Sequence, residues 1–179
     1  MKKRTIVSLT AMVCLTLIAT DSMSQQSPKL SDAEVAHAAV TANQIDIDFA
    51  EIAKSKSTNT EILKFAETMA NDHKAVIAQA ASLAKKLGVT PAGNDVSKQL
   101  IADAEKTKAT LRSTSKSNFN KVYIDNEVSY HKAVISAVEG LLIPETENSE
   151  LKELLQNVVP ALKAHLQHAE MVQKMFPGK

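Results

Sequence analysis

The stretch STNTEILKFAETMANDH, residues 57–73, decides the fold, because it holds a helix start followed by a long amphipathic helix. Residues 58–61 (TNTE) have the spacing of a capping box, in which a Ser or Thr and a Glu three residues later satisfy each other's backbone amides. Apolar positions then recur every three or four residues, the period of one helical face. This face comprises Ile62, Phe65, Met69, His73, Ile77, Ala80, Leu83 and Leu87. Gly88 and Pro91 predict its end.

The segment before residue 57 is also predicted to form an amphipathic helix. Residues 31–34 (SDAE) form another capping box. An apolar face follows and ends near Lys56; its members are Val35, Ala38, Ala42, Ile45, Phe49 and Ile52. The turn between the two helices is short, so we expect them to form an antiparallel hairpin.

The rest of the chain is also helical in pattern. Three amphipathic stretches follow, at Val96–Leu111, Phe119–Leu142 and Glu150–Phe176. A polar break at 113–118 separates the first two, and Pro144 lies in a short turn between the last two. Pro160 predicts a kink or a local opening of the helix, because its ring nitrogen cannot donate to the Gln156 carbonyl. The predicted fold is all-α: a ferritin-like four-helix bundle of two antiparallel hairpins, with a crossover that carries an extra short helix.

Composition supports one helical domain and excludes some partners. The chain has 179 residues, 44% of them apolar, but only 3% aromatic and no Trp. Ala, Leu, Val and Ile must therefore fill the core, which favours closely packed helices. The 21 basic residues nearly equal the 20 acidic ones. Nucleic-acid binding driven by phosphate neutralisation is not expected from such a balance.

The N-terminus reads as a secretory signal peptide. Basic residues 2–4 precede an apolar run at 6–19, and small residues near Ser24 suit cleavage. The apolar run is too short to span a bilayer. We therefore predict a signal peptide at 1–24, a flexible segment at 25–30, a helical-bundle domain at 31–176 and a periplasmic location. Cys14 is the only cysteine, so the mature chain has neither disulfides nor thiolate metal ligands.

The histidines carry the chemical interest of the sequence. His73, His131 and His165 lie on the apolar faces of three different predicted helices. Bundle cores build metal sites from facing helices, and neutral imidazole is a common metal ligand. Any one such His, taken alone, is more often a buried residue with an ordinary hydrogen bond. The candidate ligands are His73, Glu127 and His165, joined by Asp46 or His131.

The expected heights of these candidate ligands along the bundle axis place some of them close together and others apart. With the first turn centred near Ser57, Asp46 lies about five residues, or roughly 7 Å, from the level of His73. With the last turn centred near Pro144, His165 is level with Tyr123, and His131 is about eight residues, or roughly 12 Å, away. This geometry favours a pairing of His165 with Glu127 and assigns His131 to a separate polar cluster. Asp72 is expected to be solvated.

Several stretches resemble a known family. They are Phe65–His73, Phe119–His131, Val159–Leu166 and the region of Asp46. The chain resembles the bacterial exported, ferritin-like proteins of unknown function that are often labelled outer membrane proteins. This resemblance covers roughly Leu30–Phe176 and implies a helical bundle and export, but no established activity. No spanning helix follows the signal peptide, so we expect a soluble periplasmic protein.

The sequence departs from the di-iron ferritins. Those proteins place Glu-x-x-His on two helices. Here Ala70 stands three residues before His73, and Leu162 stands three residues before His165. If a divalent metal is bound, the His-rich set favours zinc, copper or nickel over a di-iron centre.

Two functional hypotheses remain open at the level of sequence. The first is a periplasmic bundle that binds a divalent metal for storage, buffering or sensing. The second is a non-catalytic envelope or stress-associated interaction protein without metal, whose histidines only satisfy buried polar groups. No catalytic constellation is visible, so an enzyme is not predicted. No nucleic-acid partner and no membrane span of the mature chain are expected, and a protein partner or homo-oligomer is left open.

Overall fold

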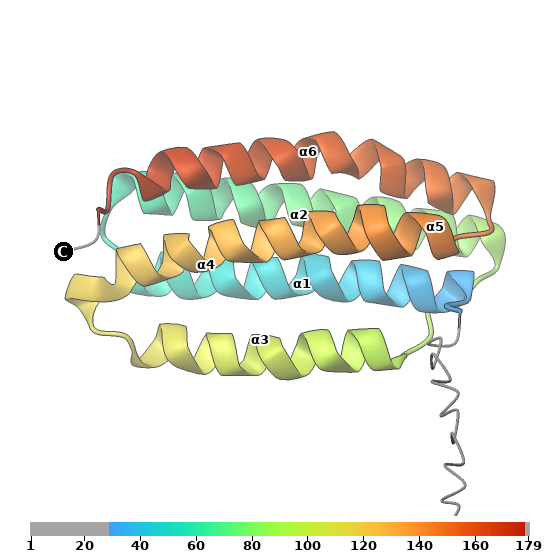
Figure 1. The fold of residues 1–179 in the computed structure, drawn as a ribbon, viewed down its shortest axis with the longest axis horizontal. Helices are drawn as coiled ribbons and strands as arrows, with labels where there is room; N and C mark the ends of the chain where they lie inside the picture. Colours follow the sequence, from blue (N-terminus) through green and yellow to red (C-terminus); the bar gives the residue numbers. More distant parts are fainter. Residues whose placement is uncertain (1–28, 178–179) are drawn as a thin grey trace, which may run out of the picture.

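The computed structural model describes residues 29–177, which form an all-helical bundle (Figure 1). The long helices are α1 (Asp32–Lys56), α2 (Thr60–Leu87), α3 (Asp95–Ser113), α4 (Lys116–Ala137) and α6 (Ser149–Gln173); η1 (Val138–Leu142) and α5 (Ile143–Glu145) stand between α4 and α6. The all-α prediction is confirmed. The predicted signal peptide lies outside the described residues, as does most of the segment 25–30. No helix within residues 29–177 has the length and apolar character needed to cross a bilayer.

The helix ends follow from local sequence, with one correction. At the start of α1, the Ser31 hydroxyl accepts from the Glu34 amide, and the Glu34 carboxylate accepts from the Ser31 amide at 2.9 Å, as predicted. The capping box predicted at 58–61 is wrong. Asn59 caps α2 instead, and its side chain accepts from the amides of Glu61 and Ile62. Asn is as good a cap as Thr, and its use leaves a turn of only three residues.

The C-terminal end of α2 needs a glycine. Gly88 has a φ of +65°, in the left-handed region, and its amide bonds to the carbonyls of Ala84 and Lys85. Glycine adopts this conformation without a steric penalty. The stop predicted from the sequence at Gly88 is confirmed.

The helices run up and down, with one helix outside the central four. The pairs α1–α2 and α4–α6 are antiparallel hairpins, and α3 carries the chain back along α1, so that α2 and α4 run in the same direction (Figure 1). At 19 residues, α3 is longer than the short crossover helix predicted. The loops at its two ends therefore lie at opposite ends of the bundle.

The hairpin between α4 and α6 differs from the prediction in a way that matters for the site. The predicted helix 119–142 begins earlier, at Lys116, and changes to a π-helix at Val138–Leu142. A short α5 follows, and the chain turns only at residues 146–148, beyond Pro144. Pro160 lies inside a continuous α6.

The core has two halves of different composition. One buried cluster, towards the α1–α2 turn, contains the aromatic rings of Phe49, Phe65, Phe119 and Tyr123. The other, towards the α4–α6 turn, is aliphatic, and its members include Val35, Leu142, Leu155 and Leu162. The buried histidines and carboxylates lie where the two halves meet, so the bundle holds them away from water at its centre.

Candidate metal centre

Three histidines from three helices meet inside the bundle. His73 on α2, His131 on α4 and His165 on α6 are all buried. Their ring centroids lie 5.3 Å (His73–His165), 5.6 Å (His131–His165) and 5.9 Å (His73–His131) apart. Each ring offers one nitrogen to a group of possible ligand atoms that lie within 4.8 Å of one another. Imidazoles from three separate helices therefore converge at one place.

One nitrogen of each ring is held by an oxygen acceptor. His73 Nδ1 lies 2.7 Å from Asn43 Oδ1, and His131 Nδ1 lies 3.0 Å from the Glu127 carbonyl oxygen. His165 Nε2 lies 3.0 Å from Asp72 Oδ2. The Asn43 amide is itself oriented, because its Nδ2 donates to the Ala39 carbonyl at 2.8 Å. An oxygen acceptor requires a donor, so each of these ring nitrogens carries the proton of a neutral imidazole.

The opposite nitrogens are left as bare lone pairs. His73 Nε2, His131 Nε2 and His165 Nδ1 are all buried and have no hydrogen-bond partner among the described residues. A buried polar atom without a partner is costly, and three at one place call for an explanation. Metal-ligating histidines show this arrangement, in which one nitrogen is anchored to an oxygen and the other is free to bind. The donor set thus fits a metal ion.

Two buried carboxylates adjoin the histidines. Asp46 on α1 is fully buried, and its Oδ2 lies 3.4 Å from His73 Nε2 and 3.5 Å from His131 Nε2. Glu127 on α4 is also fully buried, with Oε2 3.6 Å from His131 Nδ1. None of the four carboxylate oxygens has a hydrogen-bond partner among the described side chains and backbone. Asp46, Glu127 and His131 form a second group with ligand spacing, which shares His131 with the first.

Burial sets the protonation of this cluster. It raises the pKa of Asp46 to about 8, and it raises that of Glu127 well above the usual value, with the nearby Asp46 as a further cause. Burial lowers the pKa of His73 to about 3 and that of His131 to about 4. Without a cation His73 and His131 are therefore neutral at pH 7, and the carboxyl groups of Asp46 and Glu127 retain protons that a metal ion would displace.

The separation of His131 from His165 expected from the sequence is wrong, and the turn explains why. The α4–α6 turn centres on Glu147, not on Pro144. His165 lies eighteen residues after Glu147 and is therefore level with residue 129, between Glu127 and His131. A shift of three residues in the turn changes the register of two antiparallel helices by six. His131 thus belongs to the same cluster as His165, and Glu127 lies beside Asp46 and His131.

The register of α1 against α2 also explains the position of Asp46. The turn centres on Thr58, which makes Asn43 level with His73, and the two side chains bond. Asp46 lies one turn further along the same face of α1. Side chains on a helix tilt towards its N-terminus, and these helices are antiparallel, so Asp46 and His73 lean towards each other. Their separation is consequently 3.4 Å despite the axial offset.

Two residues of the site had no assigned role in the sequence analysis. The sequence analysis missed Asn43, because a turn centred on Ser57 places residue 41 opposite His73, whereas the observed centre at Thr58 places Asn43 there. Asp72 was expected to be solvated, and its side chain is indeed 54% exposed, but it accepts from His165. The 10% exposed His165 side chain and Asp72 mark the place where the cluster comes nearest to solvent.

A family profile described as a domain of unknown function, DUF4142, matches residues 18–172. The chain belongs to the DUF4142 family. The resemblance to an uncharacterised family is therefore confirmed, whereas the ferritin-like and outer-membrane labels form no part of this description. A comparison of this DUF4142 chain with curated proteins found no match.

The DUF4142 chain also has a solved structural neighbour, described as CopM in the Cu(II)-bound form. The TM-score is 0.63 at 18% identity, and the match covers 83% of this chain and 100% of the neighbour. At that identity the likeness shows a shared helical fold.

Proposed function

We propose that this protein binds a divalent transition-metal ion in the interior of its bundle, with copper and zinc as the preferred ions. The observation that carries the proposal is the set of three lone pairs on His73 Nε2, His131 Nε2 and His165 Nδ1, each fixed by a bond on the opposite nitrogen. Nitrogen ligands with one or two carboxylates suit zinc and copper. The Cu(II)-bound state of the structural neighbour supports copper.

The five residues have different parts in this proposal. His73, His131 and His165 supply the nitrogens, and Asp46 supplies the adjacent carboxylate. Glu127, whose carboxyl group lies next to His131 Nδ1, adds negative charge that offsets the positive charge of a buried metal ion. Because every donor belongs to the chain and lies buried, the arrangement suits holding an ion for storage or buffering. The exposed Asp72 carboxylate beside His165 gives a cation its point of entry.

We further propose a periplasmic location, which rests on the signal-peptide pattern of residues 1–24. The N-terminal sequence of protein recovered from its native host tests this. A chain that begins near Gln25 supports export, and a chain that retains residues 1–24 contradicts it.

The experiment is a metal titration of chelator-stripped protein with Zn²⁺ and with Cu²⁺. We expect one tightly held ion and a rise in Tm, because an ion that binds only the folded state stabilises it by about 2.7 kcal/mol at 100 times Kd. The electron paramagnetic resonance spectrum of the Cu²⁺ form should show coupling to nitrogen ligands.

Variants separate a bundle-interior site from adventitious binding. His73→Ala and His165→Ala should each abolish the rise in Tm, whereas His37→Ala should keep it, since His37 lies outside the cluster and contacts Thr41. An unchanged Tm with both metals would leave the non-metal interaction protein as the better hypothesis. An equal metal-induced rise in Tm in all three variants would also favour the non-metal interaction protein, because the metal would then bind outside the cluster.

A further inference from the structure

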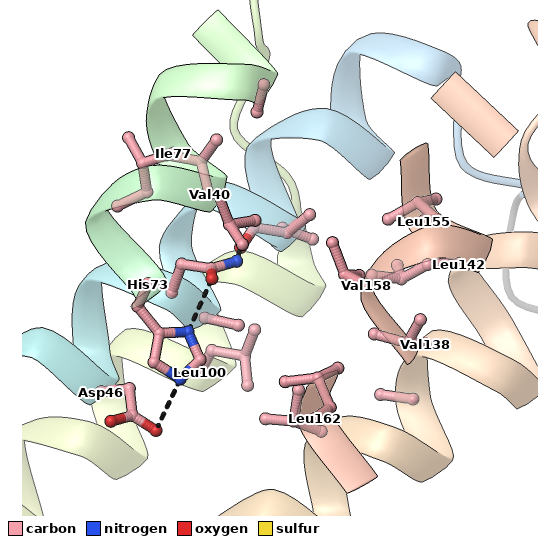
Figure 2. A pocket seen from close by; sticks show the side chains of 18 of the residues that line it. Val40, Asp46, His73, Ile77, Leu100, Val138, Leu142, Leu155, Val158 and Leu162 are labelled. Carbon is pink, nitrogen blue, oxygen red and sulfur yellow. Dashed lines mark hydrogen bonds and ion pairs between the residues drawn. The ribbon is translucent and has the colours of Figure 1, made fainter. Parts of the chain in front are cut away.

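A large cavity adjoins the candidate metal centre. Its volume is about 600 Å³, and it lies between α1, α2, α3, α4 with η1, and α6. Its lining on α6 runs from Leu151 to His165, fourteen residues or about 21 Å along the axis. Figure 2 shows His73 and Asp46 beside it, with aliphatic side chains from α2 and α6 around the same space. Ligand pockets typically measure about 300–1,000 Å³.

The cavity occupies the aliphatic half of the core. Along α2, Ile62, Phe65 and Met69 are fully buried against aromatic neighbours. After His73 the same apolar face continues, but Ile77 and Ala80 line the cavity and are only half-buried. The predicted apolar face therefore continues in the sequence, but Ile77 and Ala80 in its second half are less completely buried than the residues before His73. Half-buried apolar surface of this kind is what an apolar ligand would cover.

Small side chains create the space. Ala36, Ala39 and Ala42 on α1 and Ala133 and Ala137 on α4 line the cavity. The buried aliphatic cluster on this side contains no aromatic ring that could fill it. Apolar cavities far smaller than this one stay dry and take up apolar molecules.

Polar groups are confined to the histidine end and to the rim. Gln79 and Asp103, which also line the cavity, are exposed at its edge. Asp103 accepts from Gln99 and Lys106 on the surface. Inside, the atoms without a hydrogen-bond partner among the described residues are the lone pairs of His73 Nε2, His131 Nε2 and His165 Nδ1 and the two carboxyl oxygens of Asp46. These accept hydrogen bonds, so the matching ligand has one uncharged donor group at the end of a long apolar body.

We propose that the cavity binds a single-chain amphiphile, an alkyl chain with an uncharged hydroxyl-type head that donates to the histidine end. The chain covers the half-buried side chains of Ile77 and Ala80 on α2 and of Val158 on α6, and the head satisfies one imidazole lone pair. This inference goes beyond metal binding and applies to the metal-free protein. Its failure therefore leaves the metal proposal standing, and the reverse also holds.

The test uses the full mature chain in chelator, with methyl-labelled Ile, Leu and Val, titrated with hexan-1-ol, octan-1-ol and decan-1-ol. We expect saturable binding of one molecule, with methyl shifts centred on Ile77, Leu155 and Val158. Affinity should rise about fourfold for each added methylene, the gain for burying one such group. Decanoate at pH 7 should bind at least tenfold more weakly than decan-1-ol, because its charge would be buried.

Two Phe substitutions, one inside the cavity and one on the surface, test whether the alcohol binds in the cavity. Val158→Phe places a ring in the cavity and should weaken decan-1-ol binding at least tenfold. Ile101→Phe adds the same ring on α3, where the side chain is 46% exposed, and should leave binding unchanged. Shifts spread over surface methyls, or affinity independent of chain length, would overturn the proposal in the unmodified protein even if Val158→Phe failed to fold. Undiminished binding by a folded Val158→Phe would overturn it as well.

Discussion

At the scale of single residues, the orientation of His73 depends on one amide. Asn43 Oδ1 accepts from His73 Nδ1 at 2.7 Å, and the Asn43 Nδ2 group is tied to the backbone of its own helix. This pair of bonds fixes both the tautomer and the ring plane of His73. Outer partners of this kind tune metal ligands without touching the ion.

Replacement of this amide should therefore weaken metal binding without removing a ligand. We expect Asn43→Leu, which keeps the side-chain size but has no acceptor, to lower Zn²⁺ affinity about 10–100-fold. Competition titration against a chromophoric chelator measures the loss. Gln44→Leu is the matched control, because the exposed Gln44 side chain bonds only to Asp48. Similar affinities for the two variants would show that Asn43 does not orient His73.

At the scale of elements, helix ends and helix lengths position the cluster. The α1–α2 turn of three residues sets Asn43 opposite His73, and the longer η1–α5 connection sets His165 between Glu127 and His131. The π-helix at Val138–Leu142 forms part of that connection. Irregular helical segments of this type frequently occur next to functional sites.

The glycine at the end of α2 offers a test at this scale. Gly88→Ala should lower the free energy of unfolding by about 1 kcal/mol, because alanine is strained at a φ of +65°. Gly140→Ala, in η1, is the matched control. Neither position has an atom within 4 Å of an added Cβ, and Gly140 does not have a positive φ. Urea unfolding of both variants measures the difference, and equal stability would contradict a backbone origin of the effect.

At the scale of the whole molecule, the buried cluster makes stability depend on pH. The folded state keeps a proton on Asp46, with a pKa of about 8, and on Glu127, whose pKa is also raised; the unfolded state loses these protons near pH 4. This contribution to stability declines as pH rises towards 8. The contribution of His73 and His131 has the opposite pH dependence. Their pKa values in the folded state are lowered to about 3 and about 4, so as pH falls below about 6.5 the unfolded state binds protons that the folded state does not, and stability decreases.

The expected result for the metal-free protein is a loss of stability between pH 6.5 and 8, because the carboxyl contribution declines there while His73 and His131 are already largely neutral in both states. For Asp46 the slope is roughly 1 kcal/mol per pH unit, and Glu127, whose pKa is also raised, adds to it in the same direction. Urea unfolding in chelator across this range measures it. Asp46→Asn, of the same shape, should reduce the slope, and saturating Zn²⁺ should reverse it, because the ion binds the ionised carboxylate. A flat profile would indicate that Asp46 and Glu127 are ionised without metal.

Much of the fold follows from local chemistry. The Ser31 cap, the Gly88 stop and the apolar period predict where most helices lie, because these signals depend on neighbours a few residues away. The cap at Asn59 and the late turn after Pro144 were mispredicted, since several residues nearby could serve as cap or turn. Small errors of this kind leave the fold class unchanged.

The sequence by itself determined that this chain is a helical bundle with His73, His131 and His165 on its inner faces, because hydrophobic period specifies which side of a helix is buried. Only the tertiary structure decided that these rings meet, that Asp46 and Glu127 join them, and that a cavity opens beside them. The reason is register: a turn displaced by three residues moves facing side chains by six, and space between helices depends on every side chain around it.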